Sequence, residues 1–262
     1  MQFKGGKIQA ARYGQTNPKD YAGLVGWWHL REGLSYFRGD LAASIADQSG
    51  NGTGKNLSAQ TGSSSMGRVG NTPYGLGLYA TSGGNSIGVT AANGAFGFLS
   101  DGSPFTFITI LKNVANASGI SIASNQFASP SLGLGWQPPS SFRTLRYSNA
   151  AGSNIASNGN LSVPAGNCVE VLVNYGYNNG VNPPMVSYHN GSVLASHVFN
   201  SAPAPAPAAS RFALNIVANP NAISYLYEMI VYNNTGKTKA QIDFEMSSLY
   251  NNYIKVKYKN FV

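Results

Sequence analysis

The chain has 262 residues, of which 43% are hydrophobic and only 10% are charged. This apolar content is enough for a sizeable core and excludes global disorder, while the low charge and the 31 glycines disfavour long surface helices. The formal net charge is +8, and the basic excess is concentrated near the two ends of the chain.

The cysteine content and the apolar runs limit where the protein folds. A single cysteine, Cys168, excludes an intramolecular disulfide, as expected for a protein made in a reducing cytosol. Residues 1–10 lack the apolar stretch of a signal peptide, and no segment reaches the roughly 20 apolar residues of a membrane span. We therefore expect assembly in the host cytoplasm, without conventional secretion and without a membrane partner.

Residues 1–22 are predicted to form an extended N-terminal arm, because they are polar and contain few large apolar side chains. The cations of the arm favour docking on an acidic partner surface. These assembly residues are Lys4, Lys7, Arg12 and Lys19. Residues 23–262 are predicted to form one folded domain.

Three lysines alternate with other residues close to the C-terminal end, at Lys255, Lys257 and Lys259. This pattern favours a solvated edge strand, in which the lysines block edge-to-edge aggregation. Nucleic-acid binding is the alternative, but it would need cations interleaved with aromatic residues over a continuous surface. No nucleic-acid partner is therefore predicted.

Alternating side chains predict several strands in the first half of the chain. The first is 23–30, two more lie within 76–89 around a Ser-Gly-Gly-Asn turn, and another covers 104–111. Both faces of the strand at 104–111 are mostly apolar, which indicates a central strand.

A hairpin is the strongest local signal in the second half. Asn190-Gly191 separates two alternating runs, and the type I′ turn that it favours needs positive φ at both positions. Its strands are expected at 185–189 and 192–199. The remaining strands are expected at 169–175, 211–217 and 223–232.

One helix is predicted, at residues 238–250. Ile242, Met246 and Leu249 follow the helical spacing of 3.6 residues, and Thr238 is suited to be the N-cap. About ten or more strands followed by one late, short helix predict an all-β sandwich.

Four segments, taken in order, resemble the laminin-G-like branch of the concanavalin A-like lectin/glucanase superfamily. They are 23–33 with the Asp-Gln-Ser-Gly-Asn-Gly turn at 47–52, then 103–112, 186–194 and 223–253. The resemblance implies a jelly-roll sandwich of two antiparallel sheets, often with glycan, protein or calcium binding on the concave face or rim. It does not imply one function, because this fold hosts many.

The acidic residues give no pattern for catalysis. Glycoside hydrolysis needs two carboxylates about 5–10 Å apart, and the glucanases of the superfamily supply theirs from one strand with a Glu-x-Asp-x-x-Glu pattern. The segment most similar to this pattern is Asp243-Phe244-Glu245, which lacks the outer glutamates and lies in the predicted helix. We therefore predict that the protein is not an enzyme, with no catalytic residue and no cofactor.

Metal binding is also not predicted. His189 and His197 could approach each other across the hairpin, but zinc needs at least a third ligand and a supporting carboxylate. Cys168 has no base nearby in the sequence, which favours a small buried residue over a nucleophile. Asp47 and Asn51 could offer oxygens to calcium, but an Asx-turn is favoured for them.

An aromatic in a Gly- and Pro-containing segment provides the candidate ligand site. Trp136 is predicted to lie in a loop, where an exposed ring could stack on a sugar, and the arginines that follow could bind its hydroxyls. The alternative is a Trp that plugs the end of the sandwich beneath a Pro loop. The predicted glycan- or surface-binding residues are Trp136, Arg143, Arg146 and Tyr147.

Two classes of function compete. The favoured one is a non-enzymatic structural or adhesion protein of a virus particle, such as a phage capsid decoration protein or tail-fibre subunit. Such a protein would be located in the virion. Its partners would be other capsid or tail proteins and further copies of itself, and its possible ligand would be a cell-surface glycan. The alternative is a free-standing carbohydrate-binding lectin, and a glycoside hydrolase is the least favoured. Phage particles commonly carry jelly-roll domains, and the basic ends suit docking.

Overall fold

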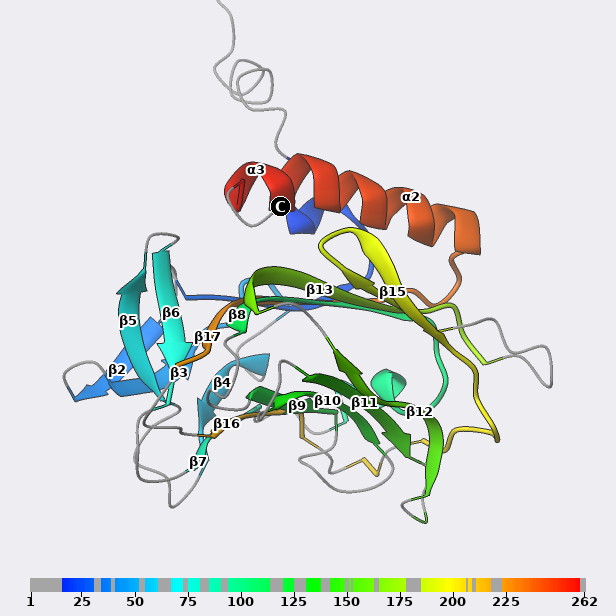
Figure 1. Ribbon diagram of the computed structural model, residues 1–262, viewed down its shortest axis with the longest axis horizontal. Helices are drawn as coiled ribbons and strands as arrows, with labels where there is room; N and C mark the ends of the chain where they lie inside the picture. Colours follow the sequence, from blue (N-terminus) through cyan, green and yellow to red (C-terminus); the bar gives the residue numbers. More distant parts are fainter. Residues whose placement is uncertain are drawn as a thin grey trace, which may run out of the picture.

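The computed structural model describes residues 16–30, 34–38, 41–51, 55–60, 67–72, 75–80, 85–90, 94–113, 120–124, 131–137, 142–148, 151, 153–162, 165–177, 185–205, 207–208, 211–217 and 223–259. Within these ranges, two layers of β-strands face each other and a helical segment lies outside one of them (Figure 1). No helix in the described part of the chain is long and apolar enough to cross a membrane.

One layer, which we call the helix-side sheet, lies beneath the helical segment, and every neighbouring pair in it is antiparallel. Its strands, from edge to edge, are β1 (Leu24–His29), β17 (Tyr225–Asn233), β8 (Phe105–Asn113), β13 (Gly166–Asn174), β14 (Met185–His189) and β15 (Ser192–His197).

The other layer, the far sheet, is also antiparallel. Its strands are, in order, β4 (Leu57–Ala59), β7 (Asn85–Thr90), β16 (Ala213–Val217), β9 (Ile120–Ala123), β10 (Ser131–Gln137), β11 (Phe142–Ser148) and β12 (Asn154–Ser162).

Four strands connect the two sheets along one edge of the sandwich: β2 (Leu34–Arg38), β3 (Leu41–Ile45), β5 (Arg68–Thr72) and β6 (Gly75–Tyr79). Strand β3 pairs with β4 of the far sheet, and β6 pairs with β17 of the helix-side sheet. A short 3₁₀ turn, η3 (Gly97–Leu99), precedes β8. The predicted all-β sandwich of two antiparallel sheets is confirmed.

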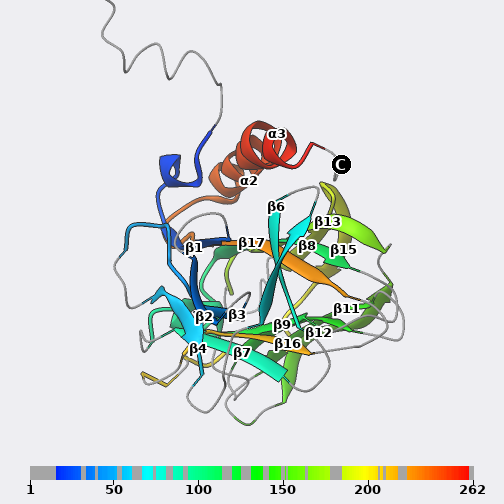
Figure 2. The ribbon, with the colours of Figure 1, turned by 90° about the vertical axis from the view of Figure 1, so that its left-hand side faces the viewer.

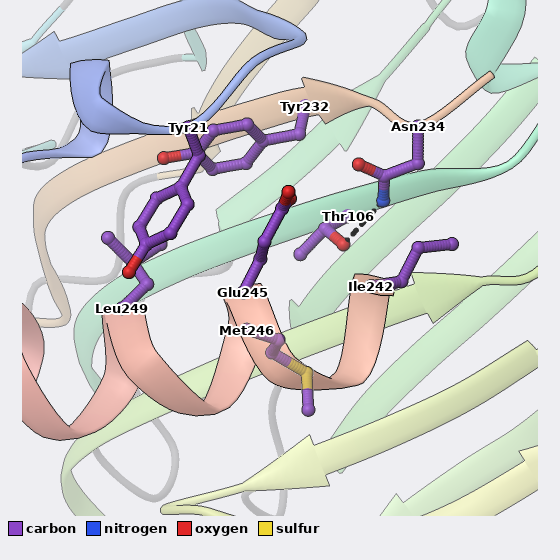
Figure 3. A pocket seen from close by; sticks show the side chains of 8 residues that line it. All are labelled: Tyr21, Thr106, Tyr232, Asn234, Ile242, Glu245, Met246 and Leu249. Carbon is purple, nitrogen blue, oxygen red and sulfur yellow. Dashed lines mark hydrogen bonds between the residues drawn. The ribbon is translucent and has the colours of Figure 1, made fainter. Parts of the chain in front are cut away.

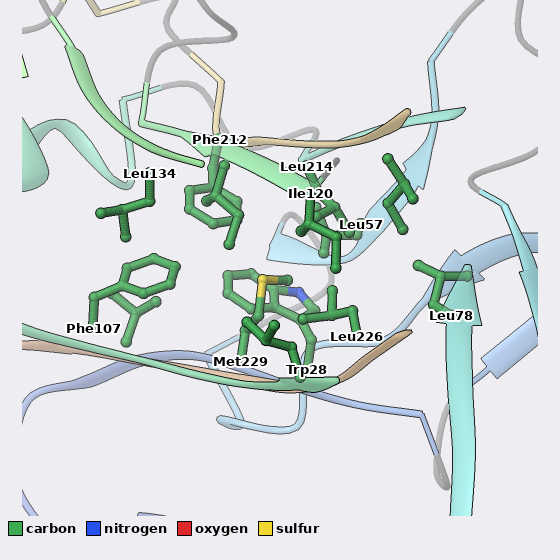
Figure 4. Close-up of a cluster of buried hydrophobic side chains, with 14 of the residues drawn as sticks. Trp28, Leu57, Leu78, Phe107, Ile120, Leu134, Phe212, Leu214, Leu226 and Met229 are labelled. Atoms are coloured by element: carbon green, nitrogen blue, oxygen red, sulfur yellow. The ribbon is translucent and has the colours of Figure 1, made fainter. Parts of the chain in front are cut away.

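The core lies between the two sheets and is centred on aromatic rings (Figure 4). Trp28 is 2% exposed and stacks on Phe212, which directly precedes β16 of the far sheet. The centroids of the two rings are 5.1 Å apart. Phe96 packs against both rings. Because successive residues of a strand point to opposite faces, Trp27 lies on the outer face while Trp28 fills the core.

Strand β8 is central, as predicted, because it pairs with β13 on one side and β17 on the other. Its two faces belong to two different clusters. Phe105 and Phe107 point into the core between the sheets, whereas Ile108 and Ile110 join an outer cluster beneath the helical segment. This explains why both faces of the strand are apolar.

The predicted helix is confirmed as α2 (Lys239–Leu249), which lies across the outer face of the helix-side sheet (Figure 2). Thr238 is its N-cap, as predicted. The Thr238 hydroxyl accepts a hydrogen bond from the backbone N–H of Gln241 at 3.3 Å, and the Gln241 side chain accepts one from the backbone N–H of Thr238 at 2.8 Å. This reciprocal capping box fixes where the helix begins.

The edge strand expected around Lys255, Lys257 and Lys259 is wrong. The chain continues from α2 through one π-helical turn, η4 (Tyr250–Ile254), into α3 (Lys255–Lys257). Ile254 and Tyr258 are buried four residues apart in the outer cluster, which is helical spacing. These buried residues therefore decide the conformation of the segment, and the alternation of the lysines does not.

The described end of the predicted arm packs on its own domain. Residues 18–20 form a 3₁₀ turn, η1 (Pro18–Asp20), and the backbone carbonyl of Pro18 accepts a hydrogen bond from the Tyr232 hydroxyl at 2.8 Å. The Tyr21 hydroxyl donates to the Ser248 hydroxyl of α2 at 2.6 Å. Three of the assembly residues, Lys4, Lys7 and Arg12, lie outside the described residues. Docking by the arm stays a prediction.

Candidate functional site

The outer face of the helix-side sheet contains a buried carboxylate. Glu228 on β17 has a fully buried side chain that accepts hydrogen bonds from the Trp27 indole N–H at 2.5 Å and the Tyr253 hydroxyl at 2.6 Å. Its other oxygen accepts from the Tyr258 hydroxyl at 2.6 Å and the Lys257 ammonium at 2.7 Å. Both carboxylate oxygens are thus saturated by β1 and the C-terminal helical segment.

Two opposing effects set the pKa of Glu228. Burial favours the neutral acid and would raise the pKa, but the positive charges of Lys257 and His29 and the hydrogen bonds from Lys257 and Tyr253 outweigh it. The pKa therefore lies below its ordinary value, and the carboxylate is charged at neutral pH. Because these donors come from β1 and the C-terminal helical segment, the network anchors that segment to the sheet.

A small cavity beneath α2 is part of the same packing (Figure 3). It encloses about 10 Å³, which is the lower limit for one water molecule. Tyr232, Glu245 and Met246 are among its lining residues, and the Asn234 side chain donates to the Thr106 hydroxyl at 2.9 Å at one end. A space of this size is a packing defect and cannot hold a ligand.

A larger open depression, which we call the hairpin groove, lies between the β14–β15 turn and the α2–η4 segment. Its volume is about 340 Å³, which lies in the range of small-molecule sites. Aromatic, amide and hydroxyl side chains line it together with one lysine. The lining residues are Val171, Tyr188, Asn190, Gly191, Ser192, Met246, Ser247, Tyr250, Asn251 and Lys255.

The turn residues Asn190 and Gly191 form one wall of the hairpin groove. Their φ angles are 49° and 81°, so the predicted Asn-Gly turn with two positive φ angles is confirmed. The Asn190 side-chain oxygen accepts a hydrogen bond from the Val169 N–H at 2.8 Å, which ties the turn to β13. Gly191 lies against the Tyr250 ring, where an added Cβ would be 2.8 Å from a ring carbon.

Tyr250 forms the floor of the hairpin groove. It is 8% exposed, and its hydroxyl oxygen has no hydrogen-bond partner among the described residues. Burial raises the pKa of Tyr250 to about 12, because it disfavours the charged phenolate. The Lys255 ammonium lies 5.3 Å from the centre of the Tyr250 ring, within the range of a cation–π contact.

The site predicted around Trp136 is only partly described. Trp136 lies on strand β10, so the expected loop is wrong: β10 pairs with β9 on one side and β11 on the other. The register places Trp136 opposite Arg143, and Arg146 and Tyr147 follow on the same strand β11. The side chains of all four residues lie outside what the structure describes, and sugar binding by them stays a prediction.

The turn at Asp47 is the expected Asx-turn. One oxygen of Asp47 accepts hydrogen bonds from the Trp27 N–H at 2.8 Å and the Ser49 N–H at 2.9 Å, and the other accepts from the Ser49 hydroxyl. The Asn51 amide donates to the Leu24 carbonyl at 2.7 Å. These contacts tie the turn to β1.

The histidines of the hairpin do not meet. His189 pairs with Ser192 next to the turn, whereas His197 pairs with Met185 at the other end of the hairpin. His197 instead contacts the Ser187 hydroxyl at 2.9 Å. The partner of His189 is Glu170. Cys168 is buried, as predicted, and although no base is near it in the sequence, Glu170 and His189 lie beside it in space.

The fold can be compared with known proteins. No protein-family model matches the chain, and no curated protein matches it in sequence. The binding domain of Paraclostridial Mosquitocidal Protein 1 is similar in structure, with a TM-score of 0.62 and 15% identity over 90% of this chain and 54% of that chain.

Two botulinum neurotoxin structures are also similar. A structure of type C, whose cell entry is dependent upon interaction with two ganglioside molecules, has a TM-score of 0.56 and 16% identity over 89% of this chain and 52% of that one. The binding domain of neurotoxin DC in complex with SialylT has a TM-score of 0.53 and 14% identity, with the same coverage of 89% and 52%. The chain spans about half the length of each of these structures, and the likeness shows the fold alone.

Proposed function

We propose that the chain is a non-catalytic recognition domain and that the hairpin groove binds a carbohydrate. The observation that carries the proposal is the composition of this groove: two tyrosines, two asparagines, two serines and a lysine surround an open space of about 340 Å³. No acidic residue is among its described lining residues, so it lacks the paired carboxylates of glycoside hydrolysis.

Sugars match such a lining for two physical reasons. Their hydroxyl groups both donate and accept hydrogen bonds, as the side chains of Asn251 and Ser192 do. Their C–H faces are apolar and pack on aromatic rings, such as that of Tyr188. A site with a few fixed polar groups around apolar surfaces is the usual construction of a small-molecule pocket.

The structural neighbours support a recognition role. Each of them has the same kind of sandwich, and two are named as binding domains, one of these in complex with SialylT. Neurotoxin type C depends on two ganglioside molecules for cell entry. These names support binding as the general role, and we propose that role for this chain.

The proposal is tested by glycan-array screening of the purified protein, followed by calorimetric titration of the best-bound sugar. Asn251→Ala and Lys255→Ala remove polar groups from the hairpin groove. Each should weaken binding about 2–10-fold, which corresponds to the roughly 0.5–1.5 kcal/mol of one hydrogen bond.

Two neighbouring residues provide matched controls. Asn252→Ala and Lys259→Ala make the same chemical changes on the same C-terminal segment, away from the groove lining, and should leave the affinity unchanged. If the groove variants bind sugar as well as the wild type while Trp136→Ala does not, the site on β10 and β11 is the correct one. If no glycan binds, the carbohydrate proposal is wrong.

We further propose that this recognition domain belongs to a virus particle, as a structural or adhesion subunit of a phage capsid or tail. The support is the sequence resemblance to laminin-G-like domains of such particles and the basic arm with Lys4, Lys7 and Arg12. The test is mass spectrometry of purified virions. Detection of the chain in stoichiometric amount is expected, and its absence from intact particles would favour a free-standing lectin.

A further inference from the structure

The inner face of the helix-side sheet contains three metal-ligating side chains close together. Cys168 and Glu170 are two residues apart on β13, so the alternation of the strand places both on one face. The register of β13 with β14 places His189 directly opposite Glu170. The sulfur of Cys168, a carboxylate oxygen of Glu170 and a ring nitrogen of His189 all lie within 4.8 Å of one another. We call these residues the inner cluster.

The inner cluster is buried but reaches the surface at one point. Cys168 is 1% exposed and Glu170 is 2% exposed, whereas the side chain of His189 is 14% exposed beside the hairpin turn. The His189 Nδ1 atom is hydrogen-bonded to Glu170, and the Asn190 side-chain nitrogen lies 3.4 Å from His189 Nε2. The ring is therefore held in place on both sides, and it is the member of the cluster that reaches the surface.

We propose that the inner cluster binds a zinc ion through Cys168, Glu170 and His189. Thiolate, carboxylate and imidazole are the donors that zinc prefers, at bond lengths of about 2.0–2.3 Å. Such bonds place tetrahedral donor atoms about 3.5 Å apart. The Cys168 sulfur, which lies within 4.8 Å of the other two donors, must therefore approach them by up to about 1.3 Å. The hydrogen-bonded atoms of Glu170 and His189 must move apart to admit the ion. The fourth position of the tetrahedron is left for a water molecule.

Charge balance makes this a favourable place for the ion. The two positive charges of zinc equal the two negative charges of the Cys168 thiolate and the Glu170 carboxylate, while His189 binds as the neutral imidazole. A neutral assembly can be buried without the large cost of an uncompensated charge. Binding converts the thiol to a thiolate and releases its proton to solvent, so affinity falls as the pH is lowered.

The ion would fix β13 to β14 beside the hairpin turn. His189 is followed directly by Asn190, whose side chain is hydrogen-bonded to the Val169 N–H between Cys168 and Glu170. A metal bond across these strands would stiffen the wall of the hairpin groove. The inference does not depend on which ligand the groove binds.

Cobalt substitution provides a direct test. The full-length protein is freed of metal with a chelator and titrated with Co²⁺, and then with Zn²⁺ against a chromophoric competitor. Because Cys168 is the sole cysteine of the chain, a thiolate-to-cobalt charge-transfer band in the near ultraviolet can come only from this residue. We expect that band at one equivalent per chain, together with a Zn²⁺-dependent rise in melting temperature.

The variants assign the other two ligands. Glu170→Gln is nearly isosteric and should weaken Zn²⁺ binding at least about 10-fold, the range seen when metal-site residues are changed. His189→Gln should do the same. His197→Gln, on the neighbouring strand, is the matched control and should bind Zn²⁺ like the wild type.

Two results would overturn the inference. One is the absence of the charge-transfer band in the wild-type protein at saturating Co²⁺, which needs no variant to interpret. The other is Zn²⁺ affinity that is unchanged in both Glu170→Gln and His189→Gln. Circular dichroism of each variant shows whether it is folded, and the wild-type cobalt spectrum decides the question if a variant is not.

Discussion

The two faces of the helix-side sheet are both buried, but by different means. On the inner face, Trp28 stacks on Phe212 and the contacts around it are mostly apolar. On the outer face, the neighbouring Trp27 donates to the buried carboxylate of Glu228, which also binds Lys257. Dispersion and the hydrophobic effect stabilise the first face, whereas the second depends on charge and on hydrogen bonds as well.

This difference explains where a ligand can bind. Around Trp28 the inner face is closely packed, which leaves little space for an organic ligand. The outer face is covered by a helical segment that meets the sheet through both apolar and polar contacts, and the hairpin groove opens where this segment passes the β14–β15 turn. The boundary of a polar interface is a natural place for a binding site, because its groups can exchange one hydrogen-bond partner for another.

The largest effect is expected from Trp28→Ala. The variant leaves a cavity in the middle of the core and should lower the free energy of unfolding by about 3–5 kcal/mol. Urea denaturation followed by circular dichroism measures it. Trp27→Phe keeps most of the ring on the outer face and loses one charged hydrogen bond, so it should cost only about 1.5–3 kcal/mol. Equal losses in the two variants would contradict the distinction between the faces.

Glu228→Gln should lower the free energy of unfolding by about 3 kcal/mol at neutral pH, because it removes the charge that pairs with Lys257. The pKa of Glu228 is lowered in the folded state. Its stabilising contribution is therefore complete above the ordinary glutamate value of 4.5 and is lost as the pH falls through the lower folded value. Denaturation at neutral and at acidic pH should show the gap between wild type and variant closing in acid. A gap of constant size would show that charge is not the cause.

Thr238→Ala removes the N-cap of α2 and should cost about 1 kcal/mol. Thr238→Ser keeps the hydroxyl and should cost much less. Since α2 covers only the outer face, hydrogen exchange should rise in the helix and in its contacts with β17, and stay unchanged around Trp28. Uniformly faster exchange throughout the sandwich would mean that the helix and the core unfold together.

Tyr250→Phe should have the smallest effect. The Tyr250 hydroxyl is buried without a hydrogen-bond partner among the described residues, so its removal should leave stability unchanged or raise it by up to about 1 kcal/mol. Tyr258→Phe is the contrasting variant, since its hydroxyl donates to Glu228, and it should be destabilised. Thermal unfolding of the two proteins side by side measures the difference. A clear loss in Tyr250→Phe would mean that an ordered water satisfies this hydroxyl.

Local patterns were enough to predict most of the elements. The alternation at β8, the Asn-Gly turn of the β14–β15 hairpin and the cap at Thr238 each depend on a few adjacent residues. Such signals are complete in the sequence, because backbone conformation and the direction of neighbouring side chains are local properties.

The sequence also favoured two wrong assignments, at Trp136 and at the C-terminal lysines. Gly and Pro near Trp136 indicated a loop, but pairing with strands on both sides made it part of β10. The spacing of Lys255 and Lys257 suggested a strand, but the burial of Ile254 and Tyr258 against the sheet favoured a helix. In both cases tertiary contacts overrode a weak local preference.

The sites were decided by register and packing alone. His189 faces Glu170 because β13 and β14 pair in one particular register, although the residues are 19 apart in sequence. The hairpin groove exists because the helical segment crosses the sheet next to the Asn190–Gly191 turn, which no short pattern encodes. The sequence by itself determined the strands, the turn and the helix cap, since these depend on neighbours along the chain. Only the tertiary structure decided which distant side chains meet, because pairing across strands and packing between layers depend on the whole chain.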